Sequence, residues 1–228
     1  MVGRVSALRV YPVKSMRGFA SDSARIVSRG IEGDRLYAVR DEAGKFGSGK
    51  NTRRFARMDG LALWSARLGG ESVEVLPPDG AGWLDAQGAE AAALLSAQVG
   101  RPVTIARETD ISHFDAAPVH IVTTADLAAL EIMGGARPAF ESFRPNILIE
   151  SAERSESWLG RRMRIGCAEL EILAPTERCL MVNVAPDGRA GPDLLRPLAQ
   201  HADACFGVYA DVVASGAVSV GDAAGFAL

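Results

Sequence analysis

The dipeptide Arg178-Cys179 is the part of this sequence whose chemistry is easiest to name. A cation beside a thiol favours the thiolate, which is the form of cysteine that attacks electrophiles and binds metals. Free cysteines are also among the most often buried residues, so a small apolar core position is the plainer alternative. Because Pro175 is expected to end the preceding strand, we predict that Cys179 lies in a loop or at a strand start.

The other cysteines and the histidines do not form a second centre. Cys167 and Cys205 are scattered and form no CxxC pair, so the sequence supports neither a disulfide framework nor a zinc or iron–sulfur site. His113, His120 and His201 lack metal-type spacing. His120 stands in an apolar run, and we expect it to be structural or to line a cavity.

Arg144 and Asn146 flank a proline in the segment FRPN. Proline disfavours the helical region for the residue before it. If the segment is extended, residues two apart point to the same side. A guanidinium and an amide on one face suit an oxyanion or the edge of a heterocycle. The alternative is a surface arginine and a turn asparagine.

Further polar groups occur at the ends of expected strands. Lys14 and Ser15 follow the first strand, and Asp34-Arg35 leads into another. Lysine, serine and arginine at such positions are the groups that a phosphate needs. For Asp34 and Arg35 the alternative is a local ion pair that orders a turn.

The scaffold that must position these residues is predicted to be mainly β with short helices, in an α+β arrangement. Short apolar runs alternate with Gly and Pro turns. We expect strands at 5–10, 24–27, 36–39, 61–67, 72–76, 103–106, 119–123, 146–149, 163–165, 168–173, 207–213 and 217–220, and helices at 89–99, 125–133 (capped by Thr124) and 193–200. A turn is predicted at 41–44 and an exposed loop at 45–57. Many strands with few helices favour a barrel over a doubly wound parallel sheet.

Composition narrows the function classes. The 228 residues suit one large domain or two closely packed small ones. Apolar residues make up 48%, and the net charge of -3 lacks the basic character of a nucleic-acid binder. There is no run of 18 apolar residues and no signal-peptide pattern at the N-terminus. We therefore expect a cytoplasmic protein that binds neither nucleic acid nor membrane.

Several motifs occur in one order along the chain: VYPVKSM from Val10, GIEGDR from Gly30, FRPNI from Phe143, Arg178-Cys179, FGVY from Phe206 and VGD from Val220. Together they closely resemble the MOSC family, named for the C-terminal domain of molybdenum cofactor sulfurase, and its amidoxime-reducing branch. The resemblance implies a MOSC-type β-barrel over 101–228, packed with a smaller N-terminal β-barrel module over 1–100. The first strands of that module are expected to complete the MOSC barrel.

The resemblance also implies a bound molybdenum–molybdopterin cofactor with Cys179 as the metal ligand and catalytic residue. Soft thiolate ligands suit this role. By the same match, the cofactor-binding positions are Lys14, Ser15, Arg35, Thr124, Asp126, Arg144, Asn146, Arg178 and Tyr209. Pyridoxal phosphate binding is a further expectation at the level of the family.

Two residues depart from the pattern of many relatives, since Glu177 and Asp126 stand where those relatives carry serine. The sequence also ends soon after the last expected strand. We therefore expect the electron donor to be a separate protein, ferredoxin-like or a flavin reductase.

The resemblance implies an oxidoreductase that reduces small N-hydroxylated or N-oxide compounds. Two alternatives stay open. Cys179 could carry sulfur as a persulfide, or the protein could carry the cofactor without turnover.

Overall fold

The computed structural model describes residues 1–70, 72–80, 82–134 and 138–227. Within these ranges the chain is mainly β with three short α-helices, as predicted, and none of those helices is long and apolar enough to cross a membrane. The helices are α1 (Ala89–Val99), α2 (Thr124–Gly134) and α3 (Leu195–His201). Four short 3-10 helices are η1 (Leu61–Leu63), η2 (Phe140–Phe143), η3 (Ser155–Trp158) and η4 (Leu180–Asn183).

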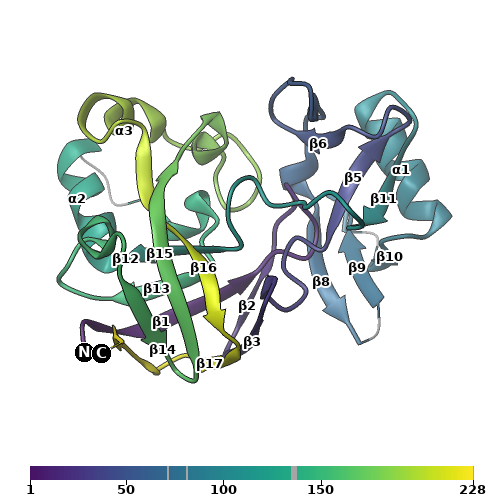
Figure 1. The fold of residues 1–228 in the computed structure, drawn as a ribbon. Coiled ribbons are helices and arrows are strands. Elements are labelled where there is room, and N and C mark those ends of the chain that lie inside the picture. Colours follow the sequence, from purple (N-terminus) through teal and green to yellow (C-terminus); the bar gives the residue numbers. More distant parts are fainter. Residues whose placement is uncertain (71, 81, 135–137, 228) are drawn as a thin grey trace.

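The larger half of the molecule is a closed seven-stranded barrel, drawn on the left of Figure 1 with α2 and α3. Its strands are β1 (Gly3–Val10), β12 (Val119–Thr123), β13 (Ile147–Glu150), β14 (Arg162–Ile165), β15 (Ala168–Glu177), β16 (Cys205–Ala214) and β18 (Ala223–Phe226). They follow the order β13-β12-β16-β15-β14-β18-β1, and the pairing of β1 with β13 closes the ring. β2 (Phe19–Ser21) extends the sheet beside β1. A core of mainly aliphatic side chains, with Trp158, fills the interior.

The smaller half is built from two short sheets and α1, drawn on the right of Figure 1. One sheet has the order β11-β5-β6-β7, with β5 (Tyr37–Asp41), β6 (Phe46–Ser48), β7 (Phe55–Arg57) and β11 (Val103–Arg107). The other has the order β10-β9-β8, with β8 (Ser65–Gly69), β9 (Ser72–Leu76) and β10 (Leu84–Asp85). Val39, Trp64, Val75, Leu95 and Ile105 are among the buried residues of their shared core.

The halves are not separate along the chain. β1 is N-terminal in sequence but forms ladders with β13 and β18 of the barrel. A third small sheet joins β3 (Ser23–Val27) and β4 (Gly30–Ile31) to β17 (Gly216–Ser219). The strands β1, β3 and β4 of the first 31 residues therefore belong with the C-terminal half, whereas Val13 and Met16 between them pack into the core of the smaller half.

Most predicted elements agree with the structure, including the helix at 89–99, which ends where Gly100 adopts a left-handed conformation. At α2 the capping residue is Thr123 rather than Thr124. The backbone N–H of Thr123 donates to Asp126 Oδ2 (2.9 Å), and the Asp126 N–H donates to Thr123 Oγ1 (3.0 Å). This reciprocal pair is a capping box, and it satisfies donors that the helix start leaves free.

Three predictions about strands and loops were also wrong. Residues 61–63 form η1, so the strand predicted over 61–67 begins only at Ser65. The loop predicted at 45–57 contains the short strands β6 and β7. Pro175 does not end its strand, because register shifts in the β15–β16 ladder let β15 continue to Glu177. Such bulges tolerate a residue that lacks an N–H donor.

Gly207 in β16 is required by close packing as well as by its backbone. Its φ is +76°, and a Cβ there would lie 2.5 Å from His120 Nε2 and 2.7 Å from the Ile121 carbonyl oxygen. Gly44 has the same φ, but a Cβ there would meet no atom within 4 Å among the described residues. A comparison of alanine substitutions at the two glycines therefore distinguishes the cost of backbone strain from the cost of a steric clash.

We predict that Gly207→Ala lowers the free energy of unfolding by about 3 kcal/mol or more, because a clash adds to the strain of a left-handed residue. Gly44→Ala should cost only about 1–2 kcal/mol, the strain alone. Urea unfolding of both variants checks this. Equal losses in the two variants would contradict the role assigned to the Gly207 contact.

Candidate functional site

A cavity of about 350 Å³ lies between the two halves of the molecule. Side chains from both halves line it: Lys14, Ser15, Arg35, Ser48, Lys50, Phe55, Phe114, Asp115, Ala116, Ala117, His120, Phe143, Arg144, Asn146, Glu177, Arg178, Cys179, Met181 and Tyr209. Eight residues predicted from the sequence are in this set. They are Lys14, Ser15, Arg35, Arg144, Asn146, Arg178, Cys179 and Tyr209, which come from five separate parts of the chain.

Asp34 anchors one wall of the cavity although the prediction did not name it as a site residue. Its side chain is fully buried, accepts the Tyr11 N–H at 2.7 Å, and forms an ion pair with Arg35. Arg35 in turn donates to Asn146 Oδ1 (3.4 Å) and to the Arg144 carbonyl oxygen (3.0 Å). The ion pair foreseen as a turn-ordering contact therefore also ties together distant segments.

Arg144 reaches the cavity in a conformation that the sequence did not predict. Proline was expected to keep it extended, but its φ of 53° and ψ of 45° are left-handed. Its N–H donates to the Glu141 carbonyl oxygen at 2.9 Å, which ends η2 with a tight turn. Burial lowers the pKa of Arg144 to about 10, and its guanidinium carbon lies 4.4 Å from the centre of the Tyr11 ring.

Asn146 holds the other side of this turn. Its side-chain oxygen accepts the His120 N–H at 3.1 Å, and its side-chain nitrogen donates to the Arg9 carbonyl oxygen at 3.3 Å. The amide thus bridges the barrel strands β1 and β12. Burial holds the pKa of His120 well below its ordinary value, so this ring is neutral at physiological pH.

Lys14 is a buried cation on the floor of the cavity. Its ammonium donates to the His113 carbonyl oxygen at 2.8 Å and lies 3.1 Å from Asp115 Oδ1. Burial lowers the pKa of Lys14 to about 8, although Asp115 raises it in part. Ser15 beside it has a φ of 68° and donates to the Gly47 carbonyl oxygen.

Cys179 is exposed at the cavity and stands at the start of η4. The buried-core alternative for this thiol does not hold in the structure. The preceding Arg178 donates through Nη2 to the Phe143 carbonyl oxygen at 2.8 Å, and burial lowers its pKa. Burial raises the pKa of Tyr209, which also lines the cavity. The thiol, the guanidinium and the phenol therefore border one space.

Thr124 and Asp126 are not among the residues that line this cavity. Thr124 Oγ1 donates to the Ser151 carbonyl oxygen and accepts its N–H. The Asp126 carboxylate caps α2 and accepts the Ser155 N–H at 3.1 Å. Their hydrogen-bonding groups are used to fix the start of α2, and their role as cofactor contacts remains a prediction.

The smaller half supplies cavity residues that sequence reasoning missed. Ser48, Lys50 and Phe55 come from the segment predicted as an exposed loop, and Phe114 and Asp115 come from the connection between the halves. The basic and glycine-containing character of residues 45–57 was the available signal. This character marked the segment as polar but did not indicate that Ser48, Lys50 and Phe55 line the cavity.

The charge of the cavity suits an anionic ligand. Among the described residues its lining holds five cations, Lys14, Arg35, Lys50, Arg144 and Arg178, against two acids, Asp115 and Glu177. Arg144 Nη2 and Arg178 Nε are buried and have no hydrogen-bond partner within the described part of the chain. Unpaired buried donors are costly, so a ligand with several acceptor oxygens fits this lining.

A metal ion in this cavity would depend on donors that the ligand brings. The described residues contain no cluster of three or more His, Cys, Asp or Glu side chains that could hold a metal. Cys179 offers a single soft donor. This donor set fits a metal carried by an anionic organic cofactor.

Two family models match the sequence. The MOSC domain model matches residues 108–224, and the MOSC N-terminal beta barrel domain model matches residues 2–68. The chain belongs to the MOSC domain family, which confirms the resemblance. The domain boundary between residues 100 and 101 stays a prediction.

Curated relatives and a solved structure make the comparison more specific. The chain is 25% identical over 279 residues to mitochondrial amidoxime reducing component 2 of Bos taurus, covering 97% of this chain and 82% of that protein. It is 25% identical over 230 residues to the protein of the same name from Macaca fascicularis, covering 82% and 68%. The YuaD protein of Bacillus subtilis has a similar fold, with a TM-score of 0.56 at 17% identity over 98% of this chain and 94% of YuaD.

The lowered pKa of Lys14 predicts a dependence of stability on pH. Between about pH 8 and the ordinary lysine value of 10.5, the unfolded chain binds a proton that the folded chain does not. The contribution of Lys14 to the free energy of unfolding therefore rises with pH in this window.

Urea unfolding of the wild type and of Lys14→Met at pH 6, 7, 8, 9 and 10 checks this. We expect the wild type to gain stability relative to the variant by about 1–2 kcal/mol between pH 8 and pH 10. The difference should be constant below pH 7. A difference that is constant throughout would show that Lys14 has an ordinary pKa.

Proposed function

We propose that this protein binds a molybdenum–molybdopterin cofactor and reduces small N-hydroxylated compounds with electrons from a separate protein. The observation that carries the proposal is the exposed Cys179 thiol beside a cationic cavity with two buried, unpartnered guanidinium nitrogens. Membership of the MOSC family and similarity to amidoxime reducing components support the choice of cofactor and reaction.

The residues divide the work by their chemistry. Cys179 would be the protein ligand of the metal. Arg144 and Arg178 would donate to oxygen atoms of the cofactor through the nitrogens that lack partners. The ammonium of Lys14, which also lines the cavity, would add positive charge. Arg35 and Asn146 already use several of their groups to hold the walls, so they would act mainly by positioning.

When bound, the cofactor would supply two-electron reduction of an N–O bond. Overall, an N-hydroxyl compound takes up two electrons and two protons, the N–O bond breaks, and water leaves. Phe55 and Phe114 give the cavity aromatic walls suited to a flat substrate. The electron donor, ferredoxin-like or a flavin reductase, the cytoplasmic location and pyridoxal phosphate binding remain predictions.

The exposed thiol also keeps the sulfur-carrier hypothesis open. A persulfide on Cys179 would need access to a donor protein, and the Cys179 side chain is accessible. The surplus of cations and the unpartnered nitrogens favour a large anion instead, because a persulfide brings a single negative charge.

The decisive variant is Cys179→Ala, expressed in a host that makes the molybdenum cofactor. We expect it to lose at least about tenfold in molybdenum content, because the thiolate is the protein's ligand. Its thermal midpoint without cofactor should stay close to that of the wild type, since the side chain is exposed. Elemental mass spectrometry, pterin fluorescence and circular dichroism provide the measurements.

Cys167→Ala is the matched control, because Cys167 is also exposed but does not line the cavity. It should keep wild-type molybdenum and pterin. Wild-type protein without molybdenum from a competent host would defeat the proposal. An added sulfur atom on intact wild type that Cys179→Ala lacks would then support the sulfur carrier.

A further inference from the structure

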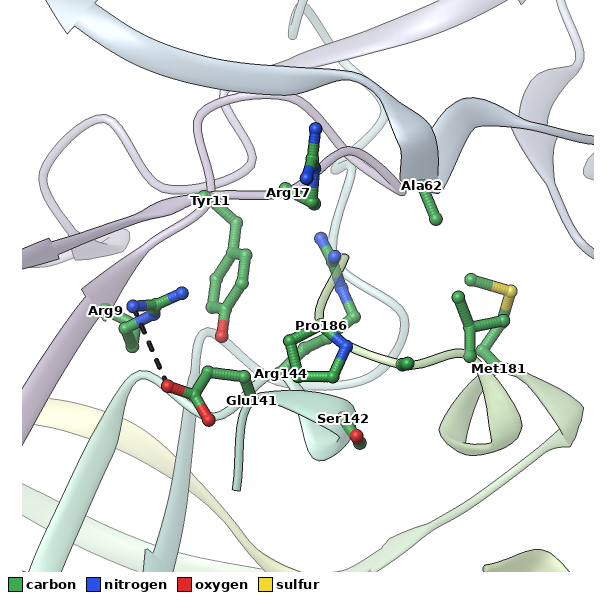
Figure 2. Close-up of a pocket in the computed structure, with 12 residues that line it drawn as sticks. Arg9, Tyr11, Arg17, Ala62, Glu141, Ser142, Arg144, Met181 and Pro186 are labelled. Atoms are coloured by element: carbon green, nitrogen blue, oxygen red, sulfur yellow. Dashed lines mark ion pairs between the residues drawn. The ribbon is translucent and has the colours of Figure 1, made fainter. Parts of the chain in front are cut away.

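A second, much smaller pocket adjoins the main cavity and shares Arg144 and Met181 with it (Figure 2). It lies between the end of β1, the loop that follows β1, η2 and the chain after η4. Its volume is about 30 Å³. A buried water needs roughly 10–15 Å³ in this measure, so the pocket has room for about two waters or one small oxyanion.

Four hydrogen-bond donors of this pocket lack partners within the described residues. They are Arg9 Nε, the Tyr11 hydroxyl, Arg17 Nε and Arg144 Nη2, and all four atoms are buried. Arg144 Nη2 borders both pockets and carries two hydrogens, so it can donate once to each ligand, whereas the other three donors belong to this pocket alone. Figure 2 shows the Tyr11 side chain reaching into the pocket with its hydroxyl at the tip. Each of these donors costs about 1–3 kcal/mol when it is buried without an acceptor, so a ligand that supplies acceptors along the pocket would be stabilised.

Tyr11 is held in place by its surroundings. Only 2% of the residue is exposed, and its backbone N–H is fixed by Asp34. The guanidinium carbons of Arg144 and Arg35 lie 4.4 and 4.9 Å from the centre of its ring. The hydroxyl therefore has little freedom to turn to another partner.

The charge balance points to an anion. Three guanidinium groups, from Arg9, Arg17 and Arg144, line the pocket against the single carboxylate of Glu141. That carboxylate is 3.9 Å from Arg9 Nη1, a loose ion pair. Arg17 uses Nη2 to reach the Leu63 carbonyl oxygen at 2.7 Å, which leaves Nε for a ligand.

We infer that this pocket is a binding site for a small tetrahedral oxyanion, of the phosphate or sulfate class. A tetrahedral anion offers acceptor oxygens in several directions, which matches donors that come from separate elements around the pocket. Glu141 limits the positive charge and closes one side. Arg9, Tyr11 and Arg17 do not line the main cavity, so this site is distinct from the proposed cofactor site.

The site is tested first by locating an anion. Crystals of the purified protein, grown without sulfate or phosphate, are soaked in selenate. We expect an anomalous selenium peak in the pocket, with selenate oxygens within hydrogen-bonding distance of the Tyr11 hydroxyl and of at least one of the lining arginines. Ordered waters in the pocket with no selenium peak would overturn the inference.

Calorimetric titration with inorganic phosphate tests the same contacts in solution. Tyr11→Phe keeps the ring and removes the hydroxyl, and it should weaken binding about tenfold. Arg17→Gln should weaken binding at least as much. Tyr37→Phe is the matched control, because Tyr37 lines neither pocket. Equal phosphate affinities in Tyr11→Phe, Arg17→Gln and the control would also overturn the inference.

Phenyl phosphate distinguishes the source of the anion. If it binds as inorganic phosphate does, with the same sensitivity to Tyr11→Phe, the site holds the phosphoryl group of a larger ligand. If only inorganic phosphate binds there, the site holds a free ion. Because none of these measurements uses turnover or molybdenum, this inference can fail or succeed independently of the proposed function.

Discussion

The buried ion pair of Asp34 and Arg35 is the contact on which the site depends. Asp34 receives the Tyr11 N–H, and Arg35 passes the connection to Asn146 and to the Arg144 carbonyl oxygen. The end of β1, the loop before β5 and the turn before β13 therefore form one hydrogen-bonded unit. A buried carboxylate whose partner is removed is strongly destabilising, so none of these segments can shift alone.

The cavity also carries more positive charge than its own carboxylates can neutralise. Arg35 is balanced by Asp34 and Lys14 by Asp115, but Arg144 and Arg178 are partly buried without a carboxylate at hydrogen-bonding distance among the described residues. Their lowered pKa values express the cost of this arrangement. An anion that binds only the folded chain would raise the free energy of unfolding and so offset this cost. The unbalanced positive charge of Arg144 and Arg178 therefore favours the binding of an anion, and the other contacts of the fold hold these two side chains in place.

The sequence predicted the barrel and most of the cavity lining, because alternation and turn residues are local signals and the motif order is specific. It failed where the outcome depends on tertiary contacts. The left-handed turn at Arg144 is stabilised by Arg35, 109 positions away, and the passage of β15 through Pro175 depends on bulges against β16. The segment 45–57 resembled a loop since its polar residues gave no sign of pairing with β5. Thr124 and Asp126 remain predicted cofactor contacts, and in the structure their side chains hydrogen-bond to backbone groups at the start of α2 and at Ser151.

The location of the cavity between the halves has a consequence for how the protein can be divided. β1 is at the N-terminus, yet it closes the barrel through β13 and contributes the network that begins at Tyr11. Ser48, Lys50 and Phe55 come from the smaller half and face the same cavity as Cys179. A C-terminal fragment that began near residue 101 would lack a strand of the ring and would expose the edges of β13 and β18. Free edges pair with other chains, so such a fragment would lose both its cavity wall and its protection from association. The two halves therefore form one structural unit around one site, although each has its own hydrophobic core.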